Sequence, residues 1–185
     1  MGYRVSRRSR RPAALWANGQ GRSEVVFSEP ASDRWVWRLS VAEIATDSRF
    51  SVFENVDRLL VPLQDDVRLE MDGTEKTVSR GQVERFRGEL DVRAVGVASP
   101  RSVLNLMTRR GLVVADLEVV EHAGTLAGDG RELVAYVIDG TARLSARVTL
   151  SAGDACRVIG HSAIAVDGVV ALARIRPVGR AQHGL

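Results

Sequence analysis

The feature that most restricts the fold of this chain is a series of short runs in which apolar and polar residues alternate. Residues 144–150 alternate in this way, and residues 37–41 and 67–71 show the same period of two. Asp-Gly pairs follow several of the apolar runs, at residues 72–73, 139–140 and 167–168. A period of two is typical of a strand with one buried face, and Asp-Gly favours a tight hairpin turn. The pattern therefore predicts an all-β protein of antiparallel strands, arranged as a sandwich or barrel.

A weak internal repeat divides the chain into two parts. An Asp-Gly-Thr turn followed by a Gly-polar turn occurs in residues 72–82 and again in residues 139–154. The second copy resembles the hairpin of a cupin barrel, and two cupin-like halves account for the length of 185 residues. We therefore predict a cupin-like antiparallel β-barrel protein with two fused halves, a bicupin. Its expected parts are a basic N-terminal arm (1–12), a first half (13–112), a second half continuous with it (113–178) and a flexible tail (179–185).

The positive charge of the chain is concentrated at its N-terminus. Residues 1–12 contain five of the 26 Arg and Lys residues and no acid, whereas the remainder carries 21 basic against 23 acidic residues. A short basic end is typical of a solvated terminus, so nucleic acid is not the expected partner. The alternative is a nucleic-acid-binding module that uses this arm, whose binding would depend steeply on salt.

Signals for export or membrane insertion are missing from the sequence. No apolar segment follows the N-terminal arginines, and no run of 18 apolar residues occurs, so neither a signal peptide nor a transmembrane helix is predicted. The single Cys156 excludes an intrachain disulfide. We therefore expect a cytoplasmic location and no membrane partner.

Residue types for metal or nucleophilic chemistry are sparse. The three histidines are His122, His161 and His183, and none belongs to the His-x-His pair of a cupin metal site. Cys156 lies in an alternating strand pattern and is predicted to be a small buried hydrophobic residue rather than a nucleophile. No Gly-x-Ser-x-Gly motif is present. The sequence predicts no metal, no cofactor and no catalytic residue.

Residues 15–25, LWANGQGRSEV, look at first like a phosphate-binding loop. A dinucleotide loop follows a strand and opens a helix, so that the helix N-terminus faces the anion. Here the glycines lead into residues 24–27, a β-branched and aromatic run that favours a strand. The loop therefore needs an explanation other than phosphate binding.

Several polar residues lie within otherwise apolar strand patterns. Arg38 and Ser40 share one face of the predicted strand at residues 37–43, and Asn105 is a single amide among apolar neighbours. In a barrel this face points either into a cavity or to solvent, and the pattern alone does not decide between them. An apolar cavity with a few convergent amide, hydroxyl and guanidinium groups suits a small carboxylate.

Four segments, WANGQGRSE, WRLSVAEI, FSVFENVDRLL and LNLMTRRG, occur in an order and spacing that resemble the HutD/Ves family. Members of that family carry W-x-N-G-G-G-x-T, W-R-[LVI]-S-[IV]-A-[ED], F-S-x-F-x-G-x-D-R and D-[FL]-N-[LVM]-M-x-R-R-G motifs. The resemblance covers about residues 12–112. It implies a bicupin protein of the histidine-utilisation pathway, which holds the pathway in check by binding an intermediate such as formylglutamate rather than by catalysing a step.

The resemblance also implies which residues bind the ligand. The set is Trp16, Asn18, Gly19, Gly21, Arg22, Arg38, Ser40, Glu43, Arg58, Asn105, Met107, Arg109 and Arg110. In this interpretation the glycines let the loop pass close to a cavity mouth, where Trp16 packs and Asn18 forms hydrogen bonds. The chain departs from the motifs at Gln20, Ser23, Asn55 and Val103. Val103 stands in place of an aspartate, which removes a partner for one arginine.

Two functions of different classes follow. The leading hypothesis is a non-catalytic protein that binds a small carboxylate, such as formylglutamate or urocanate, and regulates histidine utilisation. The alternative is a metal-independent enzyme acting on a similar acid, with Glu43 as the general base; burial in a dry cavity would favour it and an exposed ion pair would count against it. Edge strands of cupin barrels often pair, so a homodimer is a further expectation.

Overall fold

The computed structural model describes residues 2–16, 20–127, 132–160 and 162–178. Over these ranges the chain forms sixteen strands and one short 3-10 helix, η1 (Arg8–Arg10), which confirms the all-β prediction. Within the same ranges, no helix is long and apolar enough to cross a membrane.

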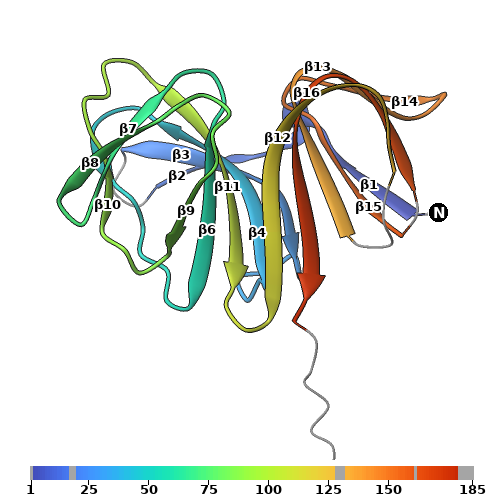
Figure 1. The fold of residues 1–185 in the computed structure, drawn as a ribbon. Helices are drawn as coiled ribbons and strands as arrows, with labels where there is room; N and C mark the ends of the chain where they lie inside the picture. Colours follow the sequence, from blue (N-terminus) through green and yellow to red (C-terminus); the bar gives the residue numbers. More distant parts are fainter. Residues whose placement is uncertain (1, 17–19, 128–131, 161, 179–185) are drawn as a thin grey trace, which may run out of the picture.

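The first half contains two antiparallel sheets with a hydrophobic core between them (Figure 1). The larger sheet has six strands in the order β2 (Ala13–Leu15), β3 (Gly21–Glu29), β4 (Trp37–Ile44), β11 (Arg101–Arg109), β6 (Val56–Pro62) and β9 (Glu84–Arg87). The smaller sheet has the order β5 (Ser48–Arg49), β10 (Val92–Ala94), β7 (Val67–Met71) and β8 (Thr74–Val78). Ile44 and Leu60 from the larger sheet and Leu69 from the smaller one belong to the same buried cluster.

The second half is one sheet that curls around its own core. Its strand order is β1 (Gly2–Ser6), β15 (Ala155–Ile159), β13 (Glu132–Ser145), β16 (Ala163–Pro177) and β12 (Val113–Ala127), and β14 (Val148–Ser151) also pairs with β13. Strand β13 is buried on both faces, as its continuous apolar run at residues 133–138 indicates. Leu133 and Ala135 face the core of the second half, whereas Val134 and Tyr136 belong to a cluster shared with the first half.

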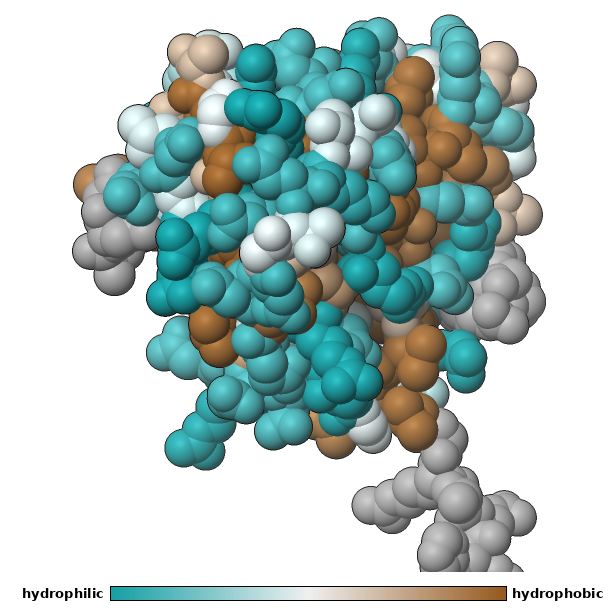
Figure 2. Space-filling model, turned by 60° about the vertical axis from the view of Figure 1, so that its left-hand side comes forward, coloured by the Kyte–Doolittle hydropathy of each residue, from teal (hydrophilic) through white to brown (hydrophobic). Residues whose placement is uncertain are grey.

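That shared cluster joins the two halves, which lie side by side in Figure 1. Trp37 and Leu39 from β4 pack in it with Val134, Tyr136 and Ile175 from the second half. The pairings among the described strands form three open sheets and no closed ring. On the face shown in Figure 2, hydrophilic side chains cover most of the surface and hydrophobic ones gather in patches between them.

Of the three Asp-Gly pairs named above, all within the described residues, only that at 72–73 is a hairpin turn. Asp72 and Gly73 connect β7 to β8 with φ values of 47° and 78°, as the sequence predicts. The pairs at 139–140 and 167–168 lie inside the long strands β13 and β16, so the prediction of turns there is wrong. Gly140 lies opposite Gly168, and a Cβ on Gly140 would come within 2.2 Å of a backbone oxygen. These glycines allow two strands to approach closely where the sheet bends.

The basic N-terminal segment is part of the fold rather than a free, solvated arm. Gly2–Ser6 forms β1 and pairs with β15 of the second half. Arg7 forms an ion pair of 2.8 Å with Asp154, and Arg11 one of 3.3 Å with Glu24. The arginines predicted to be solvated therefore include two that tie the N-terminus to both halves. The expected tail at 179–185 lies outside the described residues.

Candidate functional site

A cavity of about 100 Å³ lies in the first half, on the inner face of the larger sheet. Its lining residues are Trp16, Ser23, Arg38, Ser40, Ala42, Phe50, Ser51, Phe53, Arg58, Val103, Asn105 and Met107. Alternate residues of β4 and β11 supply half of this lining, because every second side chain of a strand points to the same face. Arg38 and Ser40 thus point into a cavity, and the solvent-facing alternative is wrong.

Strand register places the polar groups of the cavity next to one another. Asn105 lies directly opposite Ser40 on the neighbouring strand, and both side chains are buried. Met107 lies between Arg38 on one neighbouring strand and Arg58 on the other. The two guanidinium groups therefore occupy one end of the cavity and the amide and hydroxyl groups occupy the next position along the sheet.

Arg58 is 6% exposed and is enclosed by aromatic rings. Its guanidinium carbon lies 5.2, 5.8 and 4.9 Å from the ring centroids of Phe50, Phe53 and Phe86. It donates hydrogen bonds to Asn105 Oδ1 (3.1 Å) and to the Ser51 carbonyl oxygen (3.3 Å), while its buried Nε has no partner in the described part of the chain. Burial and the nearby charge of Arg38 lower the pKa of Arg58 to about 10, so the group is still charged at neutral pH.

Arg38 lies beside it with even fewer polar contacts. Its guanidinium packs over the rings of Trp35 (5.1 Å) and Phe53 (5.6 Å), and its closest polar contact is with Met107 Sδ at 4.0 Å. Its Nε is buried and has no hydrogen-bond partner within the described ranges, and burial lowers the pKa of the side chain. Among the described lining residues there is no carboxylate to neutralise either arginine. The cavity thus carries two positive charges, partly stabilised by aromatic faces and open to an anion.

Two residues of the predicted set lie on the opposite face of the sheet. Glu43 alternates with Ala42 along β4 and therefore points away from the cavity, where it forms a 2.9 Å ion pair with Arg22. Both side chains are at least one-third exposed. Placing Arg22 and Glu43 in the same site as Arg38 was therefore wrong, and the observed ion pair counts against Glu43 as a general base there.

The glycine loop is only partly described. Asn18 and Gly19 lie outside the described residues. Trp16 lines the cavity and its ring packs edge-on against Phe50. A Cβ on Gly21 would come within 2.8 Å of the Trp16 ring and 2.5 Å of the Glu43 carbonyl oxygen. Gly21 is thus required for the packing of Trp16 at the cavity.

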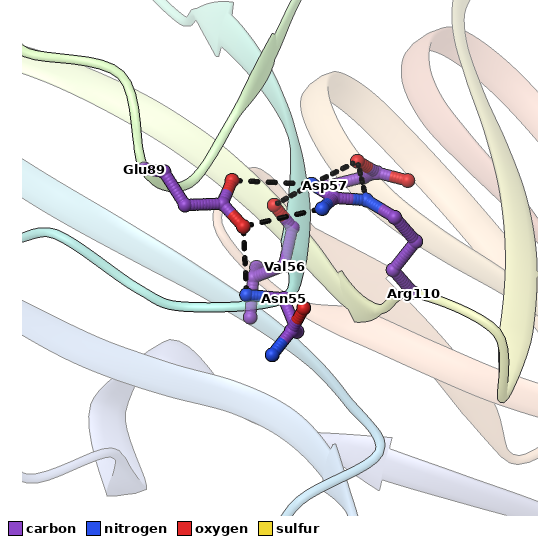
Figure 3. Close-up of polar contacts among 5 residues, drawn as sticks. All are labelled: Asn55, Val56, Asp57, Glu89 and Arg110. Carbon is purple, nitrogen blue, oxygen red and sulfur yellow. Dashed lines mark hydrogen bonds and ion pairs between the residues drawn. The ribbon is translucent and has the colours of Figure 1, made fainter.

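The last two predicted arginines lie at the end of β11, outside the cavity. Arg109 donates to the Trp35 carbonyl oxygen at 3.1 Å and packs over its ring. Arg110 forms ion pairs with Asp57 (3.0 Å) and Glu89 (3.1 Å), as Figure 3 shows. Arg110 lowers the pKa of Glu89 to about 2. These contacts connect β11, β6 and the loop after β9, so Arg110 has a structural role.

Sequence reasoning missed six of the lining residues, among them Ala42 and Val103, which lie on β4 and β11 beside predicted ones. Phe50, Ser51 and Phe53 come from the FSVF segment, from which only the later Arg58 was selected, and Ser23 follows the glycine loop. The aromatic residues are the ones that surround the guanidinium groups. The signal that would have identified them is the need of a buried cation for aromatic faces.

Two further observations in the described part of the chain concern metal binding and thiol reactivity. No group of three or more His, Cys, Asp and Glu side chains is placed to hold a metal ion there, although His161 and His183 lie outside it. Cys156 is fully buried, and burial raises the pKa of its thiol to about 12, as expected for a small core residue.

Comparison with known proteins identifies the family. The HutD family model matches residues 6–173. The chain belongs to the HutD family. Protein Ves from Citrobacter koseri is 34% identical over 149 residues, which cover 78% of each chain.

Solved structures agree on the fold. HutD from Pseudomonas fluorescens SBW25 (formate condition) superimposes with a TM-score of 0.86 at 22% identity, covering 96% of this chain and all of that one. A cupin 2 conserved barrel domain protein from Leptotrichia buccalis aligns with a TM-score of 0.56 at 10% identity, over 84% of this chain and 88% of that one. The HutD-type, cupin-like fold predicted from the sequence is therefore confirmed.

Proposed function

We propose that this HutD-family protein binds a small carboxylate in the cavity of its first half and does so without catalysing a reaction. The observation that carries the proposal is the pair of guanidinium groups of Arg38 and Arg58. Arg58 is buried and Arg38 is half-buried, and neither has a carboxylate partner among the described residues. An unpaired buried charge is costly, so a site with two of them favours binding of an anion that neutralises them.

The groups beside the two arginines support a carboxylate as the class of anion. A carboxylate presents two oxygen atoms to a guanidinium fork, and Asn105 and Ser40 supply further hydrogen-bonding groups beside the arginines. Phe50, Phe53 and Trp16 provide an apolar wall for the rest of the ligand. This combination suits an organic acid better than an inorganic anion.

The size of the cavity limits how much of a ligand it encloses. A dry cavity of about 150 Å³ holds one benzene molecule, and the present cavity is about 100 Å³. It therefore accommodates the carboxylate end of a molecule such as formylglutamate, with the remainder of the ligand towards the opening. The family relationship supports a ligand from histidine utilisation, and regulation of that pathway is the corresponding role.

The enzymatic alternative lacks its expected base at this site. Glu43 points away from the cavity and is ion-paired with Arg22. None of the described lining residues is an acid or a histidine. No observation therefore favours catalysis in this cavity over binding.

The test is isothermal titration calorimetry of the full chain with formylglutamate, urocanate, glutamate, histidine and formate. Each is titrated into wild type, Arg38→Met and Arg22→Met, the last being a matched control on the opposite face of the sheet. We expect one of the acids to bind wild type and Arg22→Met but not Arg38→Met. The proposal fails if no acid binds, or if the acid binds equally well to Arg38→Met.

A further inference from the structure

A second cavity, of about 160 Å³, lies at the junction of the two halves. It is on the opposite face of β3 and β4 from the first cavity, because Val41 and Glu43 line it while the alternate residues Ser40 and Ala42 line the first. Tyr136 of β13 and Ala152 of the turn before β15 line it from the second half. We call it the junction cavity.

Arg11 is the buried polar group of this cavity. Its side chain is only 4% exposed, its Nη2 donates to the Gly153 carbonyl oxygen at 2.7 Å, and its Nε lies 3.3 Å from Glu24. Its guanidinium also packs over the Tyr136 ring at 6.0 Å. All three partners line the junction cavity, so the guanidinium lies at its wall, yet Nη1 is buried with no hydrogen-bond partner among the residues that the structure describes.

The charges of the junction cavity do not balance. Arg8, Arg11 and Arg22 line it together with only two acids, Glu24 and Glu43. Both acids are already paired, Glu24 with Arg11 and Glu43 with Arg22. Arg8 is left without an ion-pair partner among the described residues, so the lining carries an excess positive charge.

We propose that the junction cavity binds a second small carboxylate, distinct from the ligand of the first cavity. Arg8 and the Arg11 guanidinium supply the positive charge, and the Tyr136 hydroxyl supplies a further donor. Val41, Leu63 and Ile138 form an apolar wall for a short hydrocarbon body, which an inorganic anion would not need. Because residues from both halves line the cavity, its ligand bridges them. This site rests on its own residues and does not require the first cavity to be occupied.

The probe is butyrate, a carboxylate with a short apolar chain, and phosphate is the inorganic comparison. Each is titrated into ¹⁵N-labelled protein while backbone amide shifts are followed at Ser102 and Gly153 for the junction cavity and at Ser51 and Asn105 for the first. Two variants perturb only the junction cavity. Tyr136→Phe removes one hydroxyl and keeps the packed ring. Ala152→Trp fills the cavity from an exposed turn position.

Ala146→Trp is the matched control, an exposed turn residue that lines neither cavity. We expect saturable butyrate shifts at Ser102 and Gly153 that weaken about ten-fold in Tyr136→Phe, the effect of one hydrogen bond to a carboxylate. They should disappear in Ala152→Trp and persist in Ala146→Trp.

The outcomes for the two cavities are separable. Shifts at Ser102 and Gly153 that survive in Arg38→Met support the junction site even if the first cavity binds nothing. Absence of saturable shifts there in wild type overturns the junction site, whatever occurs at Ser51 and Asn105. Saturation by phosphate with no response to butyrate overturns the assignment to a carboxylate.

Discussion

Arg38→Met should raise the stability of the free protein while removing its ligand. Arg38 forms no hydrogen bond to oxygen or nitrogen among the described residues, so no buried partner is left unsatisfied when it is replaced. Its removal eliminates a buried, unpartnered Nε–H and relieves the repulsion that lowers the pKa of Arg58. Methionine retains an apolar body against Trp35 and Phe53.

The free-energy contributions of the lost and removed groups predict that Arg38→Met is slightly more stable than wild type. Loss of two cation–π contacts costs about 0.5–1 kcal/mol each. Removing a buried unsatisfied donor gains about 1–3 kcal/mol. The net gain expected is about 0.5 kcal/mol, which corresponds to a rise in Tm of about 1–2 °C for a chain of this size.

Bound ligand should reverse the order of stability of wild type and Arg38→Met. A ligand at 100 times its Kd stabilises the wild type by about 2.7 kcal/mol and leaves a non-binding variant unchanged. Urea unfolding without ligand should therefore rank Arg38→Met above wild type, and unfolding with saturating ligand should rank wild type above Arg38→Met. Arg22→Met, which loses only an exposed ion pair, should lie within about 0.5 kcal/mol of wild type in both cases.

One result would refute this reasoning. If Arg38→Met is destabilised by more than about 1 kcal/mol and still binds ligand as the wild type does, Arg38 is a packing residue. The charge argument for the cavity would then lose its main support.

The remaining predictions concern four single groups. Carboxylate affinity should be constant at neutral pH and fall as the pH rises through about 10, where Arg58 loses its proton, and calorimetry over that range checks it. Val103→Asp puts back the acid of the family motif, which would pair with one of the two guanidinium groups and should weaken carboxylate binding in a folded protein, as calorimetry and circular dichroism would show. Cys156 should not react with a thiol reagent in the native state and should react fully in urea. Because the folded pKa of Glu89 is lowered to about 2, its stabilising effect is present above its ordinary value of 4.5 and is lost as the pH falls towards 2. Glu89→Gln should remove this acid-dependent part of unfolding without changing ligand binding.

The period of two in residues 37–43 was sufficient to predict which side chains of β4 share a face. It places Arg38 and Ser40 together and Glu43 with Trp37, on the other side of the sheet. Assigning Glu43 to the same site followed from the family motif, which groups residues by sequence and not by face. Where the family motif and the period of two disagree about the face on which Glu43 lies, the structure agrees with the period of two.

Other features depend on contacts that no local pattern contains. The Asp-Gly pair at 139–140 has the composition of a turn, yet its position in a long strand depends on Gly168 lying opposite it. Similarly, Gly2–Ser6 is too short to be recognised as a strand, and its partner β15 lies about 150 residues away. Pairing over such distances is set by tertiary packing, which overrides local propensity.

The arginines packed against aromatic rings in this fold differ in whether a carboxylate of the protein pairs with them. Arg157 is 7% exposed and packs over Trp37 at 5.2 Å, much as Arg58 packs over its phenylalanines. Arg157, however, lies 2.6 Å from Glu29 and 2.5 Å from Glu132, so its charge is neutralised within the protein. Arg58 and Arg38 have no such carboxylate among the described residues, although the chain contains 23 acids. Since the buried guanidinium of Arg157 is paired within the protein, the lack of a carboxylate beside Arg38 and Arg58 supports the proposal that an anion is supplied to the first cavity from outside.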